Sequence, residues 1–370
     1  MKKILFLIHD LGPGGAEKVL VNLVNNMERT KFDITVMTLF DIGVNRQFLN
    51  NDITYKTVFP KSFPGNSHVM KLFSPQMLHK LFIKEHYDME VSYLEGPCAR
   101  IISGCPHQDT KLVCWIHSTM HSKQDITNSF RSYDEAVRSY NRMDAMVYVA
   151  GTVRDSFQKY CQTTQVNAVL YNTNESDKII EMSKELIEEP AFVNSEFRMI
   201  GVGKITQNKG FDRLIRITKR LRTDGLQVHT YILGEGEQAA EITKLIDEYG
   251  LEENITLLGY QKNPYKYVSK CDLFVCSSHS EGFSTAATEA LIVGIPVCTV
   301  EVSGMKEMLG ENNEYGIVTE NDEDALYQGI KQLLDDPKLL EHYRQKAVER
   351  GKTFSTENTV KAVEKMLLNL

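Results

Sequence analysis

The sequence predicts an α/β protein built from two doubly wound parallel sheets, and three observations lead to this fold class. Short apolar runs alternate with stretches of helical periodicity along the chain, a pattern typical of βαβ units. The alternation occurs in two rounds, which a polar, glutamate-rich segment at 172–196 separates. At 370 residues the chain also has the length of two domains rather than one.

The first round predicts an N-terminal domain at residues 1–171. Its opening run, Ile4–Ile8, is apolar without interruption, as in a strand that helices cover on both faces of a parallel sheet. A glycine-rich loop at 12–17 and a helix with one apolar face follow this strand. Further strands are expected at 34–37, 89–93, 112–116 and 145–149.

The second round predicts a C-terminal domain at residues 198–355, which a linker at 172–197 joins to the first domain. Its strands are expected at 199–202, 228–233, 255–258, 272–276 and 296–300. A last helix, at about 356–370, has apolar residues at helical spacing, namely Val360, Val363, Met366 and Leu367. We expect this helix to pack back on the first domain.

Composition narrows the class of protein. A net charge of −7 and a pI near 5.9 argue against general nucleic-acid binding. The seven cysteines include no Cys-x-x-Cys pair, which is typical of a reduced protein without a structural zinc site. No apolar run reaches 18 residues, and the first residues form a short strand instead of a signal peptide. We therefore expect a cytoplasmic protein without a nucleic-acid partner.

The strongest candidate site is the stretch 281–289, Glu-Gly-Phe-Ser-Thr-Ala-Ala-Thr-Glu. It follows the strand at 272–276, so Glu281 is expected in the loop after a strand and Glu289 about two turns into the next helix. The N–H groups of about residues 283–286 would then lie at a helix N-terminus, which suits a phosphate. Carboxylates accept hydrogen bonds from sugar hydroxyls, so the stretch predicts a site for a sugar nucleotide. The alternative is an ordinary surface turn with two solvated glutamates.

Two lysines and a histidine are expected at strand ends. Lys204 and Lys209 follow the first strand of the second domain, where two cations could bind a diphosphate and stabilise it as a leaving group. His117 ends a strand of the first domain and is expected to face the space between the domains. The alternatives are two solvated lysines and a structural histidine.

Three further patterns are compared with dinucleotide-binding and metal-binding motifs. The loop Gly12-Pro13-Gly14-Gly15-Ala16-Glu17 has a glutamate where the dinucleotide fingerprint needs its third glycine. The stretch 234–239 fits the Gly-x-Gly-x-x-Ala form of that fingerprint, but its acidic residues at 235 and 237 would repel a pyrophosphate. Asp322-Glu323-Asp324 is interpreted as a helix N-cap and first turn instead of a metal site.

Residues 61–84 are basic and amphipathic. The segment contains Lys61, Lys71, Lys80 and Lys84 among apolar residues, and it has no acidic residue. Such a stretch can lie at a membrane interface, and contact with anionic lipid would place the protein on the inner face of a membrane. The alternative is a helix whose apolar side packs on the sheet.

Taken together, these residues resemble glycosyltransferase family 4, whose members are retaining enzymes. The resemblance covers nearly the whole chain and implies the GT-B fold, in which two Rossmann-like domains have parallel sheets that face a central cleft. Its most specific part is Glu281-Gly282-Phe283 followed by Glu289. Supporting matches are 14–17 (Gly-Gly-Ala-Glu), 209–211 (Lys-Gly-Phe), 234–236 (Gly-Glu-Gly), and 303–305 (Ser-Gly-Met) before Glu307.

The resemblance also implies roles for single residues. Glu281 would lie beside the hydroxyls of the donor sugar, and Glu289 would bind the ribose of the nucleotide. His117 would touch the donor sugar, so Glu281, Lys209 and His117 are the expected catalytic residues. The other expected donor contacts are Gly14, Gly15, Lys204, Tyr260, Gln261, Gly282, Phe283, Ser284, Thr285 and Ala286.

The chain departs from the family pattern at two places. Lys204 stands where the family usually has arginine, and lysine lacks the bidentate fork of a guanidinium. The usual Asn-Gly after the last strand of the first domain is replaced by 171–174, Tyr-Asn-Thr-Asn. Neither change removes a carboxylate or the second cation.

The expected activity is retaining transfer of a hexose from a nucleoside diphosphate sugar, UDP-sugar above all, to a glycan or lipid-linked acceptor of a bacterial surface polysaccharide. No metal and no cofactor are expected, because the leaving diphosphate would be stabilised by lysines and a helix N-terminus. Two alternatives remain open, namely a non-catalytic GT-B partner subunit and a sugar-nucleotide epimerase of the same fold.

Overall fold

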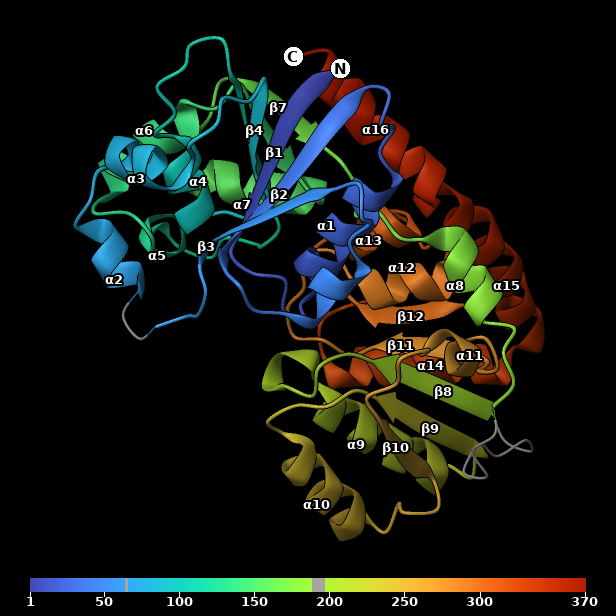
Figure 1. Cartoon of the computed structure of the whole chain (residues 1–370). Coiled ribbons are helices and arrows are strands. Elements are labelled where there is room, and N and C mark those ends of the chain that lie inside the picture. The colour runs from blue at the N-terminus through green and yellow to red at the C-terminus, as the bar shows by residue number, and fades with distance from the viewer. Residues whose placement is uncertain (64–65, 188–196) are drawn as a thin grey trace. The chain divides into compact units, whose positions relative to one another are not determined.

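The computed structural model describes residues 1–63, 66–187 and 197–370, and these form two compact units. The first unit comprises Met1–Asn174 together with Thr356–Leu370, and the second comprises Glu175–Ser355. Each unit is an α/β layer structure around one parallel sheet (Figure 1). The expected fold class, with two parallel-sheet domains, is confirmed.

The first unit contains a seven-stranded sheet in the order β3-β2-β1-β4-β5-β6-β7. All its neighbouring pairs are parallel. The strands are β1 Lys2–Ile8, β2 Phe32–Phe40, β3 Thr54–Phe59, β4 Met89–Ser92, β5 Lys111–Ile116, β6 Ala145–Tyr148 and β7 Val166–Val169. The helices are α1 Gly15–Asn26, α2 Asn66–Lys71, α3 Pro75–Phe82, α4 Pro97–Ile102, α5 Lys123–Thr127, α6 Tyr133–Asn141, α7 Gly151–Tyr160 and α16 Thr356–Leu368, with a short 3-10 turn at Val44–Phe48.

The second unit contains a six-stranded parallel sheet in the order β10-β9-β8-β11-β12-β13. The strands are β8 Phe197–Val202, β9 Val228–Leu233, β10 Ile255–Gly259, β11 Leu273–Cys276, β12 Val297–Val300 and β13 Ile317–Thr319. The helices are α8 Ser176–Met182, α9 Phe211–Thr223, α10 Ala239–Tyr249, α11 Tyr265–Val268, α12 Thr285–Ile292, α13 Met305–Leu309, α14 Glu323–Asp335 and α15 Pro337–Gly351, with 3-10 turns at Gln207–Lys209 and Lys352–Phe354.

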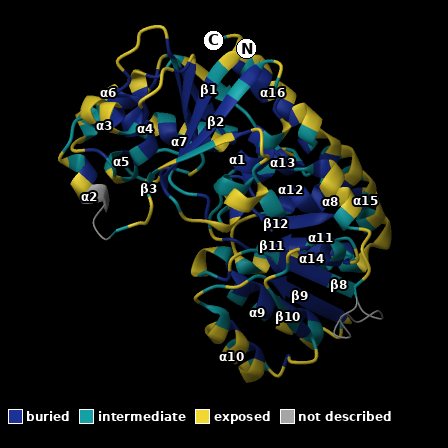
Figure 2. Cartoon of the chain, in the orientation of Figure 1, coloured by how far each residue is buried: buried dark blue, intermediate teal, exposed yellow. Residues whose placement is uncertain are grey.

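Helices cover the strands, and this explains the apolar runs of the sequence. Ile4 to Ile8 of β1 have no exposed surface, and the central strands are buried while the outer helix faces are exposed (Figure 2). Three edge strands, β3, β7 and β13, were not expected from the sequence. An edge strand has one neighbour and is partly exposed, as β3 and β7 are, so it lacks a continuous apolar run.

The C-terminal helix α16 belongs to the first unit. It buries Val360, Val363 and Leu367, and its Glu364 carboxylate accepts a hydrogen bond from the Glu28 backbone N–H at 2.6 Å just after α1. Residues 172–197, expected as a linker, include α8, which packs against α11 and α12 of the second unit. Within the described ranges, no helix is long and apolar enough to cross a membrane.

Candidate active site

In the second unit the candidate residues gather where the strand order reverses. β8 and β11 are adjacent in the sheet, while the chain runs outward from β8 in one direction and from β11 in the other. Ligands of open α/β sheets bind beyond the carboxyl ends of strands at such a switch point. The loop after β8 carries Lys204 and Lys209, and the loop after β11 carries Glu281.

Lys209 and Glu281 form an ion pair across this switch point. Lys209 Nζ lies 2.6 Å from Glu281 Oε1, and the two side chains are only 26% and 10% exposed. Burial opposes the charge of Lys209, but the Glu281 carboxylate outweighs it, so the pKa of Lys209 is raised. The lysine is therefore a cation at neutral pH. The Ser278 hydroxyl donates a second hydrogen bond to Glu281 Oε1 at 2.7 Å.

Hydrogen bonds to backbone carbonyls hold the two loops together. Asn208 Nδ2 donates to the Ser280 carbonyl at 2.8 Å, and the His279 N–H donates to the Asn208 carbonyl at 2.8 Å. Gly210 has a φ of +61°, and a Cβ there would lie 2.2 Å from the Ser277 carbonyl oxygen. Only glycine permits this close approach, and it explains the glycine directly after Lys209.

The N-terminus of α12 lies beside the ion pair. Ser284 caps this helix by accepting a hydrogen bond from the Ala287 N–H. Lys209, Glu281 and Ser284 line one cavity, with an empty volume of about 240 Å³ that includes open solvent. A cation and a helix N-terminus at one cavity are the elements that a diphosphate needs. The expected donor residues 282–286 thus lie at the start of α12, with Phe283 buried against Phe354.

Glu289 has a partner of its own. It is 7% exposed and accepts a hydrogen bond from the Tyr265 hydroxyl at 3.1 Å. The two glutamates of the stretch 281–289 therefore contact different groups, Lys209 and Tyr265. The alternative of two solvated glutamates is wrong, because both carboxylates are largely buried.

Three other candidates of the second unit lie at its surface or beside other loops. Lys204 is exposed after β8, and Tyr260 is 65% exposed after β10. Gln261 donates to the Leu258 carbonyl and accepts from the Tyr267 hydroxyl.

The glycines at 234 and 236 lie where the backbones of two loops come close together. The Ile205 N–H donates to the Glu235 carbonyl, and the Gln238 N–H donates to the Ile205 carbonyl. A Cβ on Gly236 would lie 2.1 Å from that Ile205 oxygen. The need for close approach accounts for this glycine without a dinucleotide.

Asp322 is the N-cap of α14, as the sequence predicts. Its carboxylate accepts a hydrogen bond from the Ala325 N–H at 2.8 Å. Glu323 pairs with Arg216, and Asp324 pairs with Arg220. These acidic groups therefore cap α14 or form ion pairs with arginines of α9.

In the first unit, the glycine loop and His117 also lie at carboxyl ends of strands. Gly14 is the N-cap of α1, and Gly15 is its first residue. Glu17 folds back toward Gly14, where a Cβ would lie 2.0 Å from its carboxylate. Burial, with a smaller effect of Asp10, raises the pKa of Glu17.

His117 follows β5, and its backbone N–H donates to the Glu95 carboxylate at 3.0 Å. Its Nε2 is buried and has no hydrogen-bond partner. Burial lowers the pKa of His117 to about 3, so the ring is neutral at pH 7. A buried polar atom without a partner is uncommon, and a bound hydroxyl group would satisfy it.

Comparison with known proteins identifies the family. Residues 13–173 match the model for Glycosyltransferase Family 4, and residues 182–350 match the model for Glycosyl transferases group 1. The chain belongs to glycosyltransferase family 4. It is a hexosyltransferase enzyme, and the resemblance drawn from the sequence is confirmed.

Named relatives act in the synthesis of bacterial glycans. The N-acetylgalactosamine-N,N'-diacetylbacillosaminyl-diphospho-undecaprenol 4-alpha-N-acetylgalactosaminyltransferase of Campylobacter jejuni is 29% identical over all of both chains. The lipopolysaccharide core biosynthesis glycosyltransferase LpsD of Rhizobium meliloti is 23% identical over 68% of this chain and 70% of its own. Among solved structures, Anabaena HepE in complex with UDP-glucose has a TM-score of 0.78 at 20% identity, with both chains fully covered. That likeness confirms the fold.

The structure adds site residues that the sequence analysis of this glycosyltransferase missed. Ser278 holds Glu281, and Tyr265 holds Glu289. Arg213, which is 6% exposed, contacts His279 at 2.9 Å and donates to Asn321 at 3.0 Å. Ser278 could have been found from its place directly after a strand. Tyr265 and Arg213 give no local signal, because their partners are distant in the sequence.

The low pKa of His117 predicts a loss of stability in acid. Unfolded histidine titrates near pH 6.5, so the unfolded state binds the proton first as the pH falls from about 6.5 toward about 3. From pH 7 to pH 5, the free energy of unfolding of the wild type should fall by about 1–2 kcal/mol more than that of His117→Gln. Urea unfolding followed by the fluorescence of Trp115, the single tryptophan, reports on this unit.

The matched control for that experiment is His342→Gln, which changes an exposed histidine of α15. This variant should follow the wild type at both pH values. If His117→Gln loses as much stability as the wild type, the buried ring does not stay neutral in the folded protein.

Proposed function

We propose that this chain is a retaining enzyme that transfers a hexose from a UDP-sugar to a glycan or lipid-linked acceptor in bacterial surface polysaccharide synthesis. The observation that carries the proposal is the Lys209–Glu281 ion pair at the β8/β11 switch point beside the N-terminus of α12. We assign donor binding to the second unit and acceptor binding to the first. The lipid-diphosphate acceptor in the name of the Campylobacter jejuni relative supports this acceptor class.

The ion pair indicates how Lys209 and Glu281 are held before a donor binds. Without a donor, the lysine cation and the glutamate charge neutralise each other at 2.6 Å. In the proposed complex the diphosphate takes the lysine as its counter-ion, as charge-assisted contacts to phosphate require. Glu281 then accepts hydrogen bonds from the sugar hydroxyls, while Ser278 keeps its carboxylate in place.

The proposed chemistry needs no carboxylate nucleophile. The bond between the anomeric carbon and the diphosphate oxygen breaks, and the acceptor oxygen bonds to that carbon on the same face. The acceptor proton passes to the departing diphosphate, whose charge Lys209 and the α12 N-terminus stabilise. Lys209 holds Glu281 in the empty site, and the carboxylate serves the sugar hydroxyls in this scheme.

The test is turnover of a panel of sugar nucleotides by the full chain, with and without an acceptor glycan. We expect UDP release with one UDP-sugar, a product that keeps the anomeric configuration of the donor by NMR, and the same rate in EDTA. No turnover of any donor, with or without acceptor, would favour a non-catalytic subunit. Conversion of the donor to another sugar nucleotide without acceptor would favour an epimerase. A rate lost in EDTA and restored by Mn²⁺ would contradict the metal-independent scheme.

Helices α2 and α3 support membrane contact by the first unit. Met70 and Leu78 are buried, whereas Leu72 is 76% exposed. Other exposed apolar residues of the segment are Val69, Met77 and Leu81. One side of the segment thus packs in the unit, and the other side faces outward, where a membrane contact is proposed.

Two arginines hold the exposed end of α2. Arg100 donates to the Met70 and Phe73 carbonyls at 2.8 and 2.7 Å, and Arg131 donates to the Lys71 and Leu72 carbonyls. These contacts satisfy carbonyls that a helix end leaves without partners. They hold Leu72, which is exposed, next to Lys71. We propose that this surface contacts anionic lipid on the inner face of the membrane.

We expect binding to vesicles that contain anionic lipid to fall with salt, because exposed charges are screened within ~10 Å at 0.1 M salt. Lys80→Gln with Lys84→Gln should weaken the partition by about 30-fold, because each lysine near the surface contributes about 1 kcal/mol. Leu72→Asp should also weaken it, since it places a charge at the apolar contact. Vesicle sedimentation measures these changes.

The matched control for vesicle binding is Val348→Asp, which changes an exposed apolar residue of α15 in the second unit. It should bind as the wild type does. Equal binding to neutral and anionic vesicles would exclude the electrostatic contact.

A further inference from the structure

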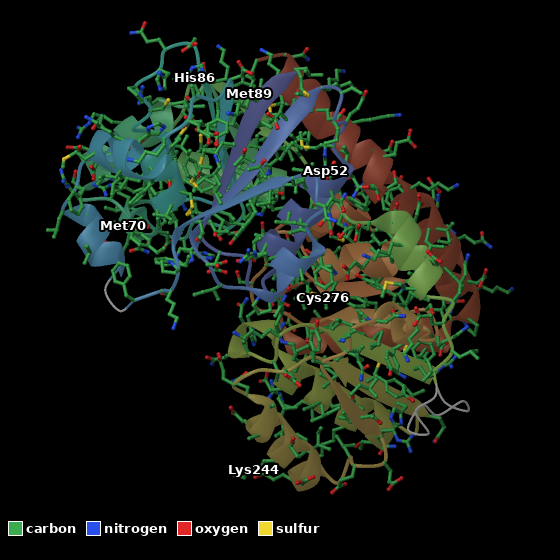
Figure 3. All side chains as sticks on the ribbon, in the orientation of Figure 1. Asp52, Met70, His86, Met89, Lys244 and Cys276 are labelled. Carbon is green, nitrogen blue, oxygen red and sulfur yellow. The ribbon has the colours of Figure 1, made fainter. Side chains whose placement is uncertain are left out.

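A cluster of three possible metal ligands lies at the amino ends of strands in the first unit. His86 precedes β4, and His107 and Asp109 precede β5. In Figure 3, His86 lies near the start of β4, which Met89 marks. β4 and β5 are parallel neighbours, so these segments meet at the edge of the sheet opposite to His117.

The ligand atoms are close enough to share one ion. One ligand atom from each of His86, His107 and Asp109 lies within 4.8 Å of the other two. His86 Nε2 is 3.3 Å from both oxygens of Asp109. That separation is long for a charge-assisted hydrogen bond. It matches two ligands of a tetrahedral zinc ion, which at about 2.05 Å from the metal lie about 3.3 Å apart.

The chemistry of the three groups also suits a divalent transition metal. Two imidazoles and a carboxylate form a ligand set that zinc accepts, with water completing the coordination. The rings of His86 and His107 meet edge to face at 4.7 Å.

All three groups are open to solvent, so an ion can enter. His86 and Asp109 are 46% and 75% exposed, and His107 is also exposed. The other candidate cluster in the described residues, His79, Glu90 and Cys105, is fully buried. There His79 already contacts both Glu90 oxygens, at 2.8 and 3.1 Å, and burial raises the pKa of the Cys105 thiol to about 11. A buried, protonated thiol beside a paired carboxylate is a poor ligand set for an entering ion.

We propose that His86, His107 and Asp109 bind one zinc ion. The ion joins the segment before β4 to the segment before β5 and stabilises the first unit. It has no part in sugar transfer, because about four to six strand residues, or roughly 13–20 Å, separate this edge from the carboxyl edge. Zinc binding at this edge is therefore independent of the donor and of the acceptor.

The experiment titrates the full chain with Zn²⁺ against a chromophoric chelator and follows thermal unfolding in parallel. We expect one site in the wild type, and a Tm that rises with Zn²⁺. His107→Ala and Asp109→Asn should each weaken Zn²⁺ binding at least tenfold and abolish the rise in Tm. The matched controls are His342→Ala, an exposed histidine of the other unit, and Cys105→Ser in the buried cluster.

Both controls should bind Zn²⁺ as the wild type does. Wild-type affinity in both His107→Ala and Asp109→Asn would overturn the proposal. Loss of binding in Cys105→Ser, with binding retained in His107→Ala, would move the site to the buried cluster and overturn it equally.

Discussion

Lys209→Ala should lower kcat for sugar transfer by about 10²- to 10³-fold, the effect of removing one group that stabilises charge in a transition state. Lys209 is a cation in a largely buried position beside the N-terminus of α12. In the proposed complex Lys209 faces the negative charge of the diphosphate, which grows as the bond between the sugar and the diphosphate breaks. Steady-state kinetics with the donor that turns over, at saturating acceptor, give kcat and KM separately.

The structure adds a second effect to this variant. Without Lys209, the Glu281 carboxylate keeps the hydrogen bond from Ser278 but loses its lysine counter-ion in a site where it is 10% exposed. Removing one member of a buried pair is costly because the other charge stays behind. The double variant Lys209→Ala with Glu281→Gln removes both charges, so its thermal stability should exceed that of Lys209→Ala alone.

Two comparisons separate catalysis from stability. Lys244→Ala changes an exposed lysine of α10 (Figure 3) and should leave both kcat and Tm unchanged. If the two residues act as a unit, kcat of the double variant should be no lower than that of the worse single variant. Wild-type kinetics in Lys209→Ala would remove this lysine from the reaction.

Glu281→Gln and Glu289→Gln should affect different steps. Glu289 is proposed to bind the ribose, so Glu289→Gln should weaken UDP and the UDP-sugar alike, by about 10- to 100-fold for one charged hydrogen bond. Glu281 is proposed to touch only the sugar, so Glu281→Gln should keep the affinity for UDP and lower kcat by about 10²-fold. Calorimetry with UDP, and kinetics with the donor, measure the two effects.

The burial of both carboxylates requires a stability control. Tyr265→Phe removes the hydroxyl that donates to Glu289 at 3.1 Å and keeps the ring and the carboxylate. If Glu289 acts through the nucleotide, Tyr265→Phe should weaken UDP less than Glu289→Gln does. Equal loss of UDP affinity in Glu281→Gln and Glu289→Gln would contradict the division of roles between the two glutamates.

The central strands could be predicted from the sequence because their signal is local. Ile4 to Ile8 and the run before Cys276 are covered on both faces, so each strand appears as an uninterrupted apolar run. The edge strands β3, β7 and β13 could not be predicted in this way. Each of them pairs with a single neighbour, the strand that precedes it in the chain, and their partly exposed residues do not form a continuous apolar run.

The sequence by itself determined the fold class, the family, and the chain segments that carry the site, because apolar periodicity and the stretch 281–289 are local patterns. Only the tertiary structure decided which groups meet. Lys209 and Glu281 are 72 positions apart and touch because β8 and β11 are neighbours in the sheet. Glu289 likewise accepts its hydrogen bond from Tyr265, which is 24 positions away in the sequence. Contacts of this kind follow from strand order and helix packing, which no short stretch of sequence contains.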